Sequence, residues 1–135
     1  ALAALDGVHA LTDVTGFGLA GHTLELARGA KLTAVIEWSK VPLLENVLAM
    51  AAEGFVTGAS GRNWAGYGAE VSLAPGLHAT TQNLLSDPQT SGGLLVSCAP
   101  DAVDAVLKVF RDEGFARAAV IGRVEAGEPS LHVVP

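Results

Sequence analysis

The segment HALTDVTGFGL, residues 9–19, decides how the chain is expected to fold. Its first half has the composition of a short strand, and the stretch TGFG leads into residues 19–28, where side chains recur at helical spacing. Gly29 is placed to end that helix. A helix that opens after a strand and a glycine loop presents free backbone N–H groups and a positive dipole, which favours a phosphate. The segment therefore predicts a strand–loop–helix unit whose loop could hold an anion.

Asp13 lies at the end of that strand, just before the loop. A carboxylate in this position is able to hold Mg²⁺ between the protein and phosphate oxygens, because Mg²⁺ takes one or two carboxylates and fills its other positions with water and phosphate. The alternative is a solvated turn residue beside glycines that serve backbone geometry. From the residues alone, the solvated turn is the favoured interpretation.

Strands and helices alternate along the rest of the chain, which predicts a sheet covered by helices. In residues 31–38 every second side chain falls on one face, which is the period of a half-buried strand. Asp101 is expected to cap a helix. Residues 54–68 contain five glycines and are predicted to be a loop. Further strands are expected at residues 69–73, 93–99, 118–124 and 130–134, the last two as a hairpin, and further helices at residues 44–53, 77–85 and after Asp101.

A second segment, SDPQTSGGLLV at residues 86–96, joins an expected helix to an expected strand. Its polar and glycine residues offer N–H and hydroxyl groups that suit an anion or a domain interface. An ordinary connection explains the same residues, and from the sequence pattern alone it is the favoured reading.

Composition limits the classes of function. The 135 residues are enough for one domain, and the net charge of −6 without a basic cluster argues against nucleic-acid binding. No apolar run reaches the ~20 residues of a membrane span, and no secretory signal is visible. The single cysteine, Cys98, is compatible with a reducing cytosol. The start at Ala1, without a methionine, is typical of a fragment of a longer protein.

Taken together, the two segments closely resemble the C-terminal half of the selenophosphate synthetase (selenide, water dikinase) family. Four shorter matches support this resemblance, which covers essentially the whole chain in the right order: Val41-Pro42-Leu43, Gly54-Phe55, Gly61-Arg62-Asn63 and Val120-Ile121-Gly122-Arg123-Val124. The resemblance implies an α+β fold with a layered sheet and covering helices, partly ferredoxin-like, as in the aminoimidazole ribonucleotide synthetase superfamily. It also implies residues 1–135 as a single C-terminal domain whose N-terminal ATP-binding domain is absent.

The implied activity of the full-length protein is synthesis of selenophosphate, AMP and phosphate from ATP, selenide and water, with Mg²⁺, in a cytoplasmic homodimer. The resemblance implies that Asp13 is a metal ligand. It also implies that four neighbouring residues shape a cofactor-binding site: Thr12, Thr15, Gly16 and Gly18. The family's catalytic Cys or selenocysteine and its partner Lys belong to the absent half. This chain therefore carries no catalytic residue, and alone it is expected neither to turn over nor to bind ATP tightly.

The remaining candidates have structural interpretations. Cys98 is expected to be a core or near-core thiol. Structural or hydrogen-bonding roles, rather than zinc binding, are expected for His9 and His22. Arg62 could reach a phosphate or a selenide-derived anion, but a surface role is at least as favoured. The Asp87–Gly93 loop is assigned to no specific ligand. Surface positions are expected for His78 and His132, and packing roles for Trp38 and Trp64.

Two other functions remain open. One is another ATP-dependent synthetase or kinase of the same superfamily, which the residues of the two segments argue against. The other is a non-catalytic binding or dimer-supporting domain, which an intact gene starting just upstream of Ala1 would favour.

Overall fold

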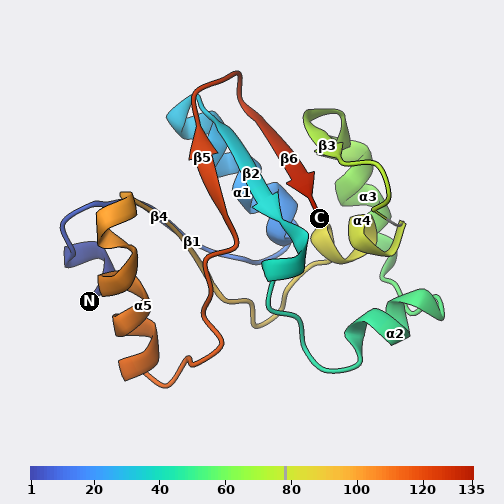
Figure 1. Cartoon of the computed structure of the whole chain (residues 1–135). Coiled ribbons are helices and arrows are strands. Elements are labelled where there is room, and N and C mark those ends of the chain that lie inside the picture. Colours follow the sequence, from blue (N-terminus) through green and yellow to red (C-terminus); the bar gives the residue numbers. More distant parts are fainter. Residues whose placement is uncertain (78) are drawn as a thin grey trace.

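The chain is built on two separate sheets (Figure 1). A computed structural model describes residues 1–77 and 79–135. β1 (Val8–Asp13) and β4 (Leu94–Cys98) form a two-stranded antiparallel sheet in which Asp13 pairs with Leu94. Side chains of β1 alternate between half-buried and exposed, so that Asp13 lies on the exposed side of this sheet.

The second sheet has four strands in the order β3-β6-β2-β5. Its central strand β2 (Thr33–Glu37) pairs in parallel with β6 (Ser130–Val134) and antiparallel with β5 (Gly122–Glu125). β3 (Val71–Leu73) pairs in parallel with the other edge of β6. The predicted hairpin is therefore wrong, because β2 lies between β5 and β6, as the cyan strand between two red ones in Figure 1 shows.

The half-buried character predicted for residues 31–38 is also wrong. Thr33, Ala34, Val35 and Ile36 are all buried, so both faces of β2 are covered. A strand that is covered on both faces shows such a continuous buried run instead of an alternation.

Three helices surround the main core: α1 (Gly18–Ala30), α3 (Gly58–Tyr67) and α4 (Ala79–Leu85). Leu24 of α1, Leu85 of α4 and Leu131 of β6 are almost completely buried there. The helix α2 (Val47–Ala52) contacts α4, and α5 (Val103–Asp112) lies on the opposite side of the molecule, near the N-terminus (Figure 1). Short 3₁₀ helices complete the chain at Leu2–Ala4, Trp38–Lys40, Gly68–Glu70 and Pro100–Ala102.

Residues 54–68 were expected to be a loop, and α3 corrects that prediction. Thr57 caps the helix, since its hydroxyl accepts a hydrogen bond from the Ser60 amide at 3.2 Å. Ser60 and Tyr67 are buried. This packing outweighs the helix-disfavouring glycines, each of which costs about 1 kcal/mol relative to alanine.

Two helix ends also differ from the prediction. α1 continues past Gly29, and Lys31 adopts the left-handed conformation (φ 57°) that closes it. Asp101 does not cap α5, because it lies in the preceding 3₁₀ turn and its side chain makes no capping bond. Both cases concern one or two residues at a boundary, where local signals specify a helix end least well.

Within residues 1–77 and 79–135, no helix has the length and apolar character that crossing a membrane requires.

Candidate functional site

The two motif segments lie against each other. The Val14 amide donates to Gly93 O at 2.9 Å, and the Gln89 amide donates to Thr15 O at 2.9 Å. A Cβ on Gly92 would lie 1.8 Å from Val14 O, so glycine is required for this approach. The loop after β1 and the loop before β4 therefore form one hydrogen-bonded unit.

Gly18 lets α1 start against the second loop. Its φ is +69°, and a Cβ there would lie 2.7 Å from Leu85 O and 2.9 Å from Asp87 O. A residue with a Cβ could adopt neither this positive φ nor this close approach without strain. Gly16 is different, because no atom lies within 4 Å of its would-be Cβ.

The carbonyl groups of residues 15–17 all accept hydrogen bonds. Thr15 O accepts from the amides of Gln89 and Gly18, at 2.9 and 3.1 Å. Gly16 O accepts from Asn63 Nδ2 at 2.8 Å, and Phe17 O accepts from Tyr67 Oη at 2.7 Å.

The backbone amides of residues 15–17, in contrast, donate to no other described residue. A loop with bonded carbonyls and free amides at the start of a thirteen-residue helix suits an anion.

Asn63 and Tyr67 are supporting residues of this loop that the sequence analysis did not assign. Asn63 Nδ2 also donates to Ser86 O at 2.9 Å, so one amide group bonds both loops. Burial raises the pKa of Tyr67 to about 12, although a bond from the Gly21 backbone opposes the shift. The Gly61-Arg62-Asn63 match was a signal for Asn63, but nothing local indicated that its side chain reaches residue 16.

Asp87 fixes the second loop to the start of α3. Its Oδ1 accepts hydrogen bonds from the hydroxyls of Thr57 and Ser60, both at 3.0 Å. Gln89 Nε2 donates to Asp87 O at 3.1 Å. The loop that was assigned to no ligand is thus held by structural bonds through its own polar residues.

His22 takes part in a chain of hydrogen bonds, as predicted. It is 7% exposed, its Nδ1 lies 2.8 Å from Glu25 Oε2, and its Nε2 lies 3.1 Å from Thr15 Oγ1. The Phe17 ring lies beside the imidazole, with centroids 5.8 Å apart. Glu25 had not been singled out from the sequence.

Asp13 is exposed, and no described residue donates a hydrogen bond to its carboxylate. Thr12 Oγ1 donates instead to the Asp13 backbone carbonyl at 3.2 Å. No group of three or more His, Cys, Asp or Glu side chains able to hold a metal occurs in the part of the chain that the structure describes. These residues therefore offer one accessible carboxylate for a cation, which fits a hydrated Mg²⁺ that takes other ligands elsewhere.

The other candidates lie away from this loop or play packing roles. Cys98 is half-buried, and burial, followed by the Asp101 carboxylate, raises the pKa of its thiol, as expected for a near-core cysteine. Trp38 and Trp64 pack against the core as predicted. His132 lies at the surface as predicted, and Arg62 is exposed as well. The structural role expected for His9 is not seen, because its side chain is exposed and forms no hydrogen bond with another described residue. His78 lies outside the described residues.

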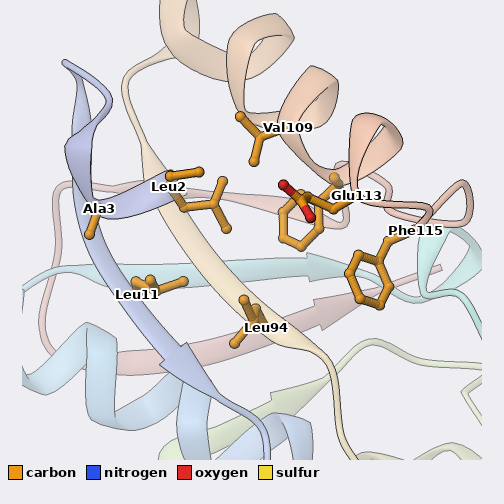
Figure 2. A pocket seen from close by; sticks show the side chains of 9 residues that line it. Leu2, Ala3, Leu11, Leu94, Val109, Glu113 and Phe115 are labelled. Atoms are coloured by element: carbon orange, nitrogen blue, oxygen red, sulfur yellow. The ribbon is translucent and has the colours of Figure 1, made fainter.

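An apolar groove lies on the side of the two-stranded sheet that faces α5 (Figure 2). It has a volume of about 360 Å³. Leu11 and Leu94 line it from β1 and β4, Phe115 lines it from beyond α5, and Leu2 lines it from the N-terminal segment. Leu94 and Phe115 are 49% and 64% exposed. Because Leu94 is the ladder partner of Asp13, the groove reaches the strand end that carries this carboxylate.

Comparison with known proteins identifies close relatives. The chain is 65% identical over 132 residues to selenide, water dikinase of Pseudomonas straminea, a match that covers 98% of the chain and 37% of the relative. It is also 65% identical over 133 residues to selenide, water dikinase of Burkholderia pseudomallei, covering 98% and 38%. The resemblance predicted from the two motif segments is confirmed. The chain spans less than two fifths of the length of these relatives.

Solved structures share the fold at low identity. Escherichia coli HypE, a hydrogenase maturation protein, has a TM-score of 0.66 at 18% identity, covering 99% of this chain and 34% of that protein. Thiamine-monophosphate kinase from Stenotrophomonas maltophilia has a TM-score of 0.62 at 16% identity, covering 94% and 31%. A HypE structure in complex with ATP has a TM-score of 0.56 at 21% identity, covering 91% and 30%. At these identities the likeness concerns the fold alone, and it confirms the predicted α+β class.

A family model described as AIR synthase related protein, C-terminal domain, matches residues 1–134. The chain therefore belongs to the family of AIR synthase-related C-terminal domains.

Proposed function

We propose that this chain is the C-terminal domain of a selenide, water dikinase, which makes selenophosphate, AMP and phosphate from ATP, selenide and water. The observation that carries the proposal is the 65% identity to relatives of that name over 98% of the chain. The two motif segments form one bonded unit, as residues that serve a common site would. The cytoplasm is the proposed location, and the free thiol of Cys98 is compatible with it.

Asp13 is the proposed Mg²⁺ ligand. Its carboxylate is exposed, and the free amides of residues 15–17 follow it directly, so a phosphate bound at the loop would lie close to a cation bound at Asp13. Bound Mg²⁺ would offset the negative charge of the ATP phosphates. Thr12, Thr15, Gly16 and Gly18 shape this site, and the further carboxylates that such a metal needs belong to the rest of the longer protein.

The apolar groove is the proposed contact with that N-terminal ATP-binding domain. The chain covers 37% of its relative from Pseudomonas straminea, and the family is described as a C-terminal domain, so the additional chain of such a relative precedes this one. Ala1, Leu2 and Ala3 line the groove, so a preceding segment would emerge there. A domain seated on the exposed Leu94 and Phe115 would bring its own residues to the strand end at Asp13. The full-length protein is proposed to be a homodimer.

The test of the function is AMP formation from ATP by the full-length protein with and without selenide. The proposal predicts AMP that depends on selenide, with selenophosphate as the second product. AMP or ADP formation that does not respond to selenide would favour another synthetase or kinase of the superfamily. Absence of any nucleotide turnover would favour a non-catalytic binding domain. The isolated chain is expected to form no AMP, because it contains one metal-binding carboxylate and no catalytic residue.

A further inference from the structure

Thr15 is an exposed residue that is nevertheless fixed from three sides. Its carbonyl oxygen accepts two backbone hydrogen bonds, from Gln89 and Gly18, and its hydroxyl lies 3.1 Å from His22 Nε2. The hydroxyl hydrogen of a threonine rotates to suit its partners. The bonds here hold both the backbone and the side chain of Thr15 in one arrangement.

The Glu25 carboxylate decides which atoms carry protons in this chain of bonds. An ionised carboxylate only accepts hydrogen bonds, so His22 Nδ1, 2.8 Å from Glu25 Oε2, must carry a hydrogen. When the ring is neutral, Nε2 holds a lone pair and accepts the Thr15 hydroxyl proton. This leaves the Thr15 oxygen as an acceptor only.

Thr15 and Asp13 are both exposed, and they flank the buried Val14 in the chain. The Asp13 carboxylate and, in this arrangement, the Thr15 hydroxyl oxygen are both hydrogen-bond acceptors. Such a pair suits a hydrated divalent cation, whose bound water molecules donate hydrogen bonds.

We propose that Glu25 and His22 are positioning residues that hold the Thr15 hydroxyl as an acceptor for water bound to the cation at Asp13. This inference rests on the proposed cation site of the preceding section. The direction of the hydrogen bonds from Thr15 through His22 to Glu25, which we call their polarity, does not depend on that site. Removing a residue that orients a metal-site group by a hydrogen bond in this way typically lowers the metal affinity by about 10–100-fold.

The polarity is tested by nitrogen-15 NMR of the histidine rings in the 135-residue chain. The expected result is a neutral His22 ring with its proton on Nδ1, and loss of that tautomer in Glu25→Ala but not in Glu25→Gln, whose amide oxygen still accepts. The exposed His9 and His132 serve as internal controls. A wild-type His22 with its proton on Nε2, or on both nitrogens, would overturn the inference.

The cation role is tested in the full-length protein by Mn²⁺ binding in the presence of ATP, measured from the spectrum of free Mn²⁺. Thr15→Val and Glu25→Ala are expected to weaken binding by about 10-fold or more, while Thr15→Ser and Glu25→Gln stay near wild type. Unchanged Mn²⁺ affinity in both Thr15→Val and Glu25→Ala would contradict the role. Because this readout needs no selenide, a protein that binds Mn²⁺ as expected but makes no selenide-dependent AMP would disprove only the proposed activity.

Discussion

Gly18 and Gly16 are both in the TGFG stretch, but the structure gives them different constraints. Gly18 combines a φ of +69° with backbone oxygen atoms within 3 Å of a would-be Cβ, whereas Gly16 has open space. Gly18→Ala is expected to lower the free energy of unfolding by about 2–4 kcal/mol, since a left-handed alanine and the overlap both cost energy. Gly16→Ala should change it by less than about 1 kcal/mol. Urea denaturation of both variants checks this, and an equal cost for the two would contradict the assigned constraint.

Tyr67 gives a second residue-scale prediction, for alkaline pH. It is the only tyrosine of the chain, and its pKa is raised from 10.0 to about 12 in the folded state. A raised folded pKa means that its stabilising contribution is complete below pH 10 and is lost as the pH rises through about 12. The free energy of unfolding should therefore fall more steeply over this window in wild type than in Tyr67→Phe. Parallel pH profiles would show that the phenol is not responsible.

The sequence pattern identified single residues well where their role is local. His22 was expected to form structural hydrogen bonds, and it does so with residues three and seven positions away. Tyr67 and Asn63 were not assigned, because their partners Phe17 and Gly16 are 50 and 47 positions distant. Contacts over such separations leave no local pattern.

At the scale of elements, α3 shows where sequence reasoning fails. Its glycines suppress the helical signal, and the cap at Thr57 works together with Asp87, which is thirty positions distant. β1, α1 and β4 were located correctly because each has a continuous pattern of its own. The split of the expected hairpin by β2 was not predictable from the turn between residues 125 and 130, because both arrangements need antiparallel strands at its ends.

Asp87→Ala is the test of how α3 is held. Removing this carboxylate takes away the acceptor of two hydroxyls at the helix start, one of them on the buried Ser60, and should cost about 1–3 kcal/mol. Hydrogen exchange should become faster in α3 and stay unchanged in α5. Asp101→Ala, which removes an exposed carboxylate without a capping bond, is the matched control. Equal exchange of α3 in both variants would show that Asp87 does not stabilise it.

At the scale of the whole molecule, substitutions in the apolar groove are expected to have different effects in the isolated chain and in the longer protein. Phe115 and Phe55 are similarly exposed, at 64% and 68%, but only Phe115 lines the groove. Phe115→Ser should change the stability of the isolated chain by less than about 1 kcal/mol. In the full-length protein it should additionally loosen the domain contact, seen as faster limited proteolysis between the domains. Phe55→Ser should leave proteolysis unchanged, and an equal effect of both variants would exclude the groove as the contact.

The most direct test of the account is the dependence of full-length activity on Asp13. Selenide-dependent AMP formation is measured for wild type, Asp13→Asn and Asp6→Asn, the last an exposed carboxylate just before β1. Asp13→Asn should lower the rate by at least about 100-fold, because a metal ligand is lost, while the fold and Asp6→Asn remain as in wild type. A fully active Asp13→Asn variant would contradict the cation site and return Asp13 to a solvated turn residue.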